Sequence, residues 1–501
     1  MKNCLRILAA CAILSMLATG GAALAAHENP TAAESQTPPD LPEGQTPRGQ
    51  TPPDLPEGQA PDEQNRYALT GVLCADGENA AYDGSTDGSE LASDQSDESV
   101  ILAKNGANLS VSNVAIGKTG DTVDSDATDF YAVNAVVAAA GGSTVELRDA
   151  ILESSAQGGN CLFATGENST IYAQNATLHS AKNNSRGLDA TFGGTIAADN
   201  LEIDTEGDHS GAVATDRGNG FISIANSTLR TAGQGSPLIY STGTIEAINV
   251  TGESTGAQIV GMEGLNKVRL RSCDLTGSGR KASEPVANGV FLYQSMSGDS
   301  SEGEALFESQ DSILSSSIDG GSMFYITNTR AEVVLKNTVL NFDAENNALI
   351  TVGGNSANGW GTPGENGGVL KFTAIGEVLK GNVVCDGIST AELYLTEESM
   401  LTGAILRGGD FEGDGGASLH LSSDSQWIVT ADSALVRLSM PEGASILDAD
   451  GRTVSVVGAD GAVYVSGDSP LTVTVESFTA EDLSAQAGAL SDLEIDRSHF
   501  E

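Results

Sequence analysis

Two acidic residues, Asp189 and Asp216, stand 27 residues apart in segments of similar sequence, and Arg217 follows the second. Two carboxylates on either side of a bound sugar can hydrolyse a glycosidic bond. With calcium and the cation of Arg217, the same residues would instead suit a polysaccharide lyase. The simpler interpretation is that both acids are outward residues on a solvated strand, in a chain with 68 acidic residues. The sequence favours this simpler interpretation, and therefore no catalytic residue.

A second candidate group combines aromatic and amide side chains. Tyr293, Tyr325 and Trp360 belong to neighbouring late segments, and Trp360 lies in a long polar loop with Asn355 and Asn358. Aromatic faces stack on sugar rings, and amides donate and accept hydrogen bonds with hydroxyl groups. These five residues are the predicted ligand-binding site. The alternative is that part of the set is buried under the loops, and the sequence leaves both interpretations open.

Both groups need a scaffold that aligns distant residues, and a sequence repeat supplies one. Five-residue units with alternating apolar residues recur every 23 to 26 residues, each ending in a small polar residue: Asp149, Asn175, Asn200, Asn226, Asn249 and Ser272. Such a period indicates a solenoid. Short strands can then pair in parallel with their copies one turn later, about 4.8 Å away. The pattern predicts an all-β parallel β-helix with three short strands per rung.

The polar residue of each unit has its own predicted role. Asn tolerates the left-handed backbone conformation that a bend requires. Copies of Asn stacked one turn apart can also bond to one another. The sequence therefore predicts a ladder of bent, mutually bonded polar residues.

Four segments resemble the right-handed pectin-lyase-like β-helix superfamily, and within it secreted bacterial adhesin-like or carbohydrate-binding proteins. They are DFYAVN at 129–134, FLYQSMSGD at 291–299, MFYITN at 323–328 and GNSANGWGTPG at 354–364. The resemblance covers roughly residues 67 to 475 and implies a right-handed, single-stranded coil. The Gly-His-Gly and Arg-x-Lys motifs of polygalacturonase-like enzymes are missing. The resemblance therefore favours a non-catalytic glycan-binding protein over a polysaccharide lyase or glycoside hydrolase; a structural surface spacer is the third interpretation.

The chain divides into five predicted regions. Residues 1–25 read as a secretory signal peptide, because a basic start precedes an apolar run and a small-residue cleavage site. Residues 26–66 are a Pro-rich linker, 67–388 the β-helix, 389–475 its C-terminal end with hairpin-like capping strands, and 476–501 an acidic tail over the last rung. Within the β-helix, an N-terminal cap is expected before the first clear unit at 109–113.

Composition limits the partners. The formal net charge is −44, which excludes nucleic acid because binding it requires Lys and Arg to neutralise phosphates. No run outside the signal peptide is long and apolar enough to span a membrane. We therefore expect a secreted protein, free or held at the cell surface, whose partner is a glycan or a host or cell-surface polysaccharide.

No metal site is predicted. The acidic stretch between Asp83 and Glu98 could bind calcium, but the ligand order of an EF-hand is absent, so a solvated loop is preferred. Cys161 and Cys273 should lie several turns apart, too far for a disulfide, and are expected to be small core residues.

Overall fold

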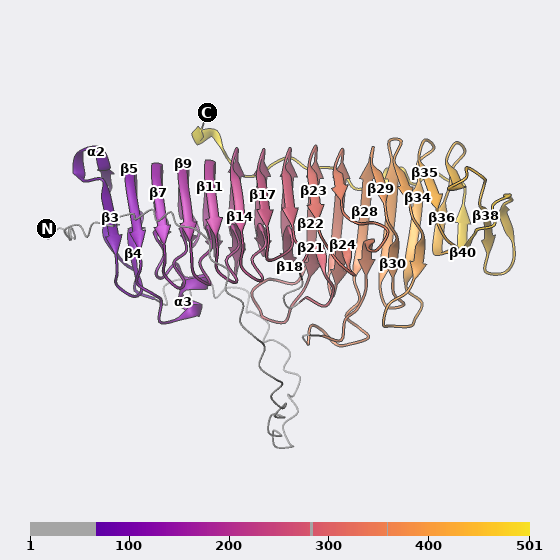
Figure 1. Cartoon of the computed structure of the whole chain (residues 1–501), viewed down its shortest axis with the longest axis horizontal. Helices are drawn as coiled ribbons and strands as arrows, with labels where there is room; N and C mark the ends of the chain where they lie inside the picture. Colours follow the sequence, from indigo (N-terminus) through magenta and orange to yellow (C-terminus); the bar gives the residue numbers. More distant parts are fainter. Residues whose placement is uncertain (1–66, 281–283, 358, 501) are drawn as a thin grey trace, which may run out of the picture.

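The computed structural model describes residues 67–280, 284–357 and 359–500, and the regular secondary structure of these residues is almost entirely β-strand. The predicted signal peptide, the Pro-rich linker and Asn358 lie outside the described residues. The strands lie side by side along the long axis of the molecule (Figure 1). Within the described part, no helix is long and apolar enough to cross a membrane.

Sheet A contains thirteen strands, and every neighbouring pair is parallel. In order they are β1 (Thr70–Asp76), β4 (Glu98–Lys104), β6 (Val137–Ala140), β8 (Leu162–Thr165), β10 (Leu188–Thr191), β12 (Val213–Asp216), β15 (Ile239–Ser241), β18 (Val260–Glu263), β21 (Asn288–Tyr293), β24 (Ser322–Thr327), β27 (Ala348–Val352), β30 (Val383–Cys385) and β33 (Ile405–Arg407).

A second series of parallel strands, here called stack B, also runs from one end of the molecule to the other. It consists of β2 (Ala80–Asp83), β5 (Asn108–Lys118), β7 (Thr144–Ser154), β9 (Thr170–Ser180), β11 (Thr195–Thr205), β13 (Phe221–Ala225), β16 (Thr244–Ile248), β19 (Asn266–Arg271), β22 (Glu304–Gln310), β25 (Arg330–Lys336), β28 (Val369–Ile375), β31 (Thr390–Thr396), β34 (Gly416–Leu421), β36 (Ser433–Ser439) and β40 (Thr472–Thr479).

The remaining strands are short. Those that pair with or continue the second halves of the long strands are β3 (Glu90–Ser93), β14 (Thr228–Thr231), β17 (Thr251–Ser254), β20 (Asp274–Gly277), β23 (Ile313–Ser316) and β26 (Val339–Asn341). A four-stranded parallel sheet follows: β29 (Val378–Lys380), β32 (Met400–Thr402), β35 (Gln426–Val429) and β37 (Ser445–Asp448). The last two are β38 (Ser455–Gly458) and β39 (Val463–Val465).

The predicted ladder of polar residues is confirmed. All six of its positions have positive φ, between 52° and 56°. The Nδ2 of Asn200 donates to the Oδ1 of Asn175 over 2.8 Å, and Asn249 donates in the same way to Asn226 over 2.8 Å. The ladder is not uniform, because Asn226 donates to Asp199 instead, over 2.9 Å.

The interior is filled by the inward side chains of the strands. Ile196 pairs in register with Ile171 and Ile222, and all three are fully buried. Further along, the interior holds larger rings: Phe324 contacts Phe307 and Phe372 with ring centroids 5.9 and 5.8 Å apart. Burying each such side chain stabilises the fold by about 1.5–3 kcal/mol. Cys161 and Cys273 belong to this interior and are free thiols, as predicted.

The structure corrects two expectations about the ends of the strand array. Residues 67–99 are not a separate cap, because β1 already pairs in parallel with β4, and β2 and β3 pair with β5. The acidic stretch forms the short helix α2 (Gly84–Asp87) between these strands. At the other end, parallel pairing continues through β34, β36 and β40, and only β38 and β39 form an antiparallel hairpin.

The predicted position of the C-terminal tail is also corrected. It does not stop over the last strands but turns back and runs along the outer face of stack B towards the N-terminal third of the molecule (Figure 1). It contains two short 3-10 helices, η1 (Ser484–Gln486) and η2 (Ser498–Phe500).

Candidate functional site

The outward face of sheet A brings both predicted groups of residues into two adjacent rows. Side chains alternate between the two faces of a strand, so parallel register aligns outward residues across neighbouring strands. One row runs through Asp189, Ala214, Tyr240, Gly261, Phe291 and Tyr325. The second row contains Asp216 at one end and Glu263 paired with Tyr293 and Thr327 further along.

Asp189 and Asp216 are joined by a residue that the sequence analysis missed, Arg186. Its Nη2 lies 2.9 Å from Oδ2 of Asp216, and its Nε lies 3.6 Å from Oδ2 of Asp189. Its Nη1 lies 2.9 Å from Oδ1 of Asp129, which belongs to the short helix α3 (Ser125–Phe130). The only local signal for this cluster was that Arg186 precedes Asp189 by three residues.

The interpretation of these two acids as solvated surface residues is wrong. Asp189 has no exposed surface, and Asp216 is 3% exposed. Burial raises the pKa of Asp216 to about 7, against the opposing effect of Arg186. Burial likewise raises the pKa of Asp189 well above its ordinary value. Neither carboxylate oxygen of Asp189 has a hydrogen-bond partner among the described residues, so this group is poorly placed to meet a substrate.

Arg217 does not join that cluster. Its Nη2 forms an ion pair with Oδ1 of Asp299, 3.1 Å away, and its guanidinium lies over the ring of Phe130, 3.9 Å from the centroid. Asp299 belongs to the inserted loop that follows β21, and Phe130 closes α3. The arginine therefore links two covering loops, and the predicted catalytic trio is divided between separate ion pairs.

The three predicted aromatic residues do come together, around Phe291. The ring centroid of Phe291 lies 4.2 Å from that of Tyr293 and 5.4 Å from that of Tyr325, with nearly parallel planes. Trp360 stacks on Tyr293 with centroids 5.0 Å apart. Phe291 and Tyr325 are buried, whereas Tyr293 and Trp360 are half-buried. Of the three predicted rings, Tyr325 is thus buried and Tyr293 and Trp360 keep accessible surface, and ligand binding stays a prediction.

The amides around Trp360 hold the loop in place. Asn355 is 3% exposed, and its Nδ2 donates to Oγ1 of Thr327 over 2.8 Å. Asn366 is also buried, and its Nδ2 donates to the backbone carbonyls of Asn355 and Trp360 over 2.6 and 2.7 Å. Asn355 was expected to face a ligand, but the structure uses its amide to fix the loop that carries Trp360.

Tyr240 and Glu263 connect the carboxylates to the aromatic rings. The hydroxyl of Tyr240 donates to Oε2 of Glu263 over 2.9 Å, and the hydroxyl of Ser297 donates to Oε1 over 3.2 Å. Glu263 is buried, and burial raises the pKa of Tyr240 well above its ordinary value. The candidate site is therefore a continuous strip whose accessible part lies at the Tyr293 and Trp360 end.

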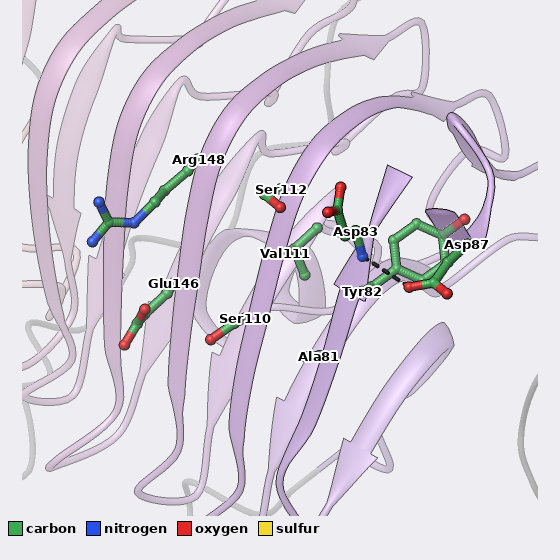
Figure 2. A pocket seen from close by; sticks show the side chains of 9 residues that line it. All are labelled: Ala81, Tyr82, Asp83, Asp87, Ser110, Val111, Ser112, Glu146 and Arg148. Atoms are coloured by element: carbon green, nitrogen blue, oxygen red, sulfur yellow. Dashed lines mark hydrogen bonds between the residues drawn. The ribbon is translucent and has the colours of Figure 1, made fainter. Parts of the chain in front are cut away.

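A separate hollow lies on the outward face of the first strands of stack B (Figure 2). It has a volume of about 240 Å³ and is lined by side chains of β2, α2, β5 and β7, which include Asp87, Ser110, Glu146 and Arg148. The sequence analysis did not single it out. Among residues 67–280, 284–357 and 359–500, no group of three or more His, Cys, Asp or Glu side chains could hold a metal ion.

Comparison with protein-family models, with curated proteins and with solved structures finds no match to this chain.

Proposed function

We propose that the chain is a secreted, right-handed parallel β-helix that binds a glycan without catalysis. The coiled fold is supported by parallel pairing between strands one sequence repeat apart and by the recurring left-handed bend at the polar ladder. Right-handedness follows from the general rule for connections between parallel strands of one sheet. Secretion rests on the signal-peptide pattern of residues 1–25.

The observation that carries the binding proposal is the stack of Trp360 on Tyr293. The two half-buried rings lie 5.0 Å apart and rest on the buried ring of Phe291. A rigid aromatic surface of this kind suits the apolar face of a sugar ring, because few rotatable bonds are frozen on binding. The loop that carries Trp360 is fixed by Asn366, so the surface is largely formed before a ligand arrives.

The net charge of the chain limits the class of glycan that it is proposed to bind. With a net charge of −44, the protein repels uronic acids at long range, since charges of like sign raise the free energy of encounter. Neutral or cationic sugars are therefore the proposed ligands, from a host or cell-surface polysaccharide.

Catalysis by the buried acids has weaker support. A glycosidase needs two carboxyl groups that both reach the glycosidic bond, but Asp189 has no exposed surface and Asp216 is tied to Arg186. A lyase or hydrolase, and a purely structural spacer, remain the alternatives to the binding function.

Substitution of the stacked rings tests the proposal. Trp360→Ala and Tyr293→Ala should each weaken binding to the best ligand on a glycan array by at least about tenfold, equivalent to about 1.4 kcal/mol. Tyr464→Ala is the matched control, because Tyr464 also stacks on a neighbour, Phe478, with centroids 4.9 Å apart, but far along the chain from the site. Affinities would be measured by calorimetry on variants shown to melt cooperatively.

Two results would contradict the proposal. If Trp360→Ala stays folded and binds as well as the unaltered chain, the rings are not the site. If Trp360→Ala unfolds the protein, Trp360 is a core residue and the surface does not exist as proposed. Turnover of an acidic polysaccharide that is lost in Asp216→Asn would favour the enzymatic alternative.

A further inference from the structure

The C-terminal tail lies across the strands of stack B rather than beside them. Two of its contacts are the hydrogen bond from the backbone N–H of Gly488 to Thr373 of β28 and the contact of Phe500 with the ring of Tyr172 of β9. From β28 to β9 there are seven spacings between strands, about 34 Å at ~4.8 Å each. Twelve residues at the polyproline II rise of ~3.1 Å cover about 37 Å, so this segment is extended over most of its length, before its last three residues form η2.

The face is also contacted by Ile495 and His499, but five of its contact residues stand three positions apart. They are Gly488, Ser491, Glu494, Arg497 and Phe500. A threefold period is that of an extended chain in the polyproline II conformation, in which every third side chain points the same way. The tail therefore presents one side to the sheet, with a fixed order of a small residue, a hydroxyl, an acid, a base and an aromatic ring.

Two buried carboxylates of the face bind the main chain of the tail. Glu246 accepts the backbone N–H groups of Glu494 and Ile495, over 2.6 and 3.2 Å. Glu308 accepts both the backbone N–H and the hydroxyl of Ser491, over 2.9 and 2.7 Å. Both glutamates are fully buried beneath the tail, so these hydrogen bonds form away from water, where they are strong.

Charged side chains fix the direction and register of the tail. Oε1 of Glu494 lies 2.6 Å from Nη2 of Arg269 and 2.8 Å from Nζ of Lys267. Three residues later, Nη2 of Arg497 lies 3.0 Å from Oδ1 of Asp199, and its Nη1 donates to the carbonyl of Ala198 over 2.9 Å. A chain in the reverse direction would exchange the acid and the base and place each beside a like charge.

Steric fit adds a further requirement at Gly488. A Cβ atom there would lie 2.4 Å from Oε1 of Glu332 and 2.9 Å from Cγ2 of Val334. Any larger residue would lift the tail from the sheet at this point. The face thus specifies a small residue, a hydroxyl, an acid and a base at three-residue intervals.

We propose that the outer face of stack B is a peptide-binding groove that accepts the C-terminal segment 488–500 of a second copy of the chain in place of its own. The contacts are side-chain contacts and hydrogen bonds to side chains, and none of these residues joins a sheet as a strand. Withdrawal of the tail therefore leaves every strand pairing intact. Residues 480–482, which link the tail to β40, are exposed. Exchange of an identical segment between copies keeps the same contacts and so changes the free energy little.

A full-length chain with a weakened tail tests this proposal, which is independent of the glycan site. The variant carries Glu494→Ala and Arg497→Ala, and the probe is a fluorescein-labelled peptide of residues 486–500 with the unaltered sequence. Fluorescence anisotropy should show the peptide binding at least tenfold more tightly to this variant than to the unaltered chain, whose groove is occupied. A peptide with the same two substitutions should not compete.

Two further variants complete the experiment: one changes a residue of the groove, and the other adds bulk to the tail. Adding Glu246→Gln to the weakened chain should reduce peptide affinity by at least fivefold, because one acceptor of the main-chain N–H groups is neutralised. If the double variant does not fold, Gly488→Val displaces the tail without touching its charges and takes its place. Equal or absent peptide binding to the unaltered chain and to folded, tail-weakened variants would overturn the proposal and make the tail a fixed part of the fold.

Discussion

The outward faces of sheet A and stack B are built from similar parallel strands, yet they are covered in different ways. Sheet A is covered by loops inserted between strands of the repeat: the loop of α3 at one end and the loop of Trp360 at the other. Stack B is covered by the C-terminal tail, whose partners lie 115 to 351 residues away in sequence. Polar groups on the two outward faces are therefore buried in two ways, by inserted loops on sheet A and by the C-terminal tail on stack B.

The two faces also differ in how they treat buried acids. Under the tail, Glu246 and Glu308 receive backbone N–H and hydroxyl donors as well as the cation of Arg269. Under the loops, Asp189 has no hydrogen-bond donor among the described residues, and its pKa is raised well above its ordinary value. The comparison teaches that equally buried acids can differ in the hydrogen-bond donors around them, because a distant segment supplies those donors under the tail.

The largest expected effect is on the stack B side. Arg269→Leu should lower the free energy of unfolding by about 3–5 kcal/mol, because Glu246 would stay buried without its ion-pair partner, whereas Glu308 keeps Arg271 at 2.6 Å. Urea denaturation at pH 7 measures the change. The exposed pair of Arg230 and Glu202 is the control, and Arg230→Leu should cost less than about 1 kcal/mol. A loss below about 1 kcal/mol for Arg269→Leu would show that the tail and solvent compensate these charges.

On sheet A, the buried carboxyl group of Asp216 should make the free energy of unfolding depend on pH. Because the pKa of Asp216 is raised to about 7, the folded state holds a proton that the unfolded state releases near pH 4. The contribution of Asp216 to stability is therefore fully present at low pH and decreases as pH rises from about 4 to about 7, by up to about 1.4 kcal/mol per pH unit. Asp216→Asn should flatten this slope in denaturation curves, whereas Asp319→Asn, at an exposed position, should leave it unchanged. An unchanged slope in Asp216→Asn would place the titration elsewhere.

A smaller effect is expected at the accessible end of the sheet A strip. Trp360→Ala should cost about 1–2 kcal/mol of stability, because a half-buried ring loses its stacking on Tyr293 and part of its burial. Phe291→Ala, which removes the fully buried ring of the same stack, should cost about 3–5 kcal/mol. Calorimetric melting compares the two. Equal losses would mean that Trp360 is part of the core.

The smallest effect concerns the tail. Hydrogen bonding to Lys267 lowers the pKa of Glu494, with Arg269 contributing. The contribution of Glu494 is thus present above its ordinary pKa, near 4.5, and is lost as pH falls below that value, the opposite sign to Asp216. Glu494→Gln should cost less than about 1 kcal/mol, since the group is partly exposed. Relative to the intrinsic exchange rate at each pH, amides 488–500 should be less protected from hydrogen exchange in this variant at pH 7, and in the unaltered chain below pH 4.5.

The sequence by itself determined the features that depend on neighbours one repeat apart. Alternation of apolar residues identified strands such as β9 and β11, and the recurrence of Asn175 and Asn200 predicted the bonded left-handed ladder. The long polar loop that carries Trp360 was also predicted, and with it the aromatic group. These predictions succeeded because strand pairing in a repeated chain is set by local pattern and a constant period.

Only the tertiary structure decided which polar residues are buried and what they meet. Asp189 and Asp216 read as solvated strand residues, because nothing near them in sequence reveals that α3 and the loop of Asp299 cover them. The tail reads as an acidic end, although Glu494 meets Arg269 at a separation of 225 residues. The contacts of the tail with stack B follow no sequence period, because the tail lies across the strands. The sequence repeat reflects only the pairing of one strand with the next. Burial by a distant segment is therefore determined by the folded shape and leaves no local pattern in the sequence.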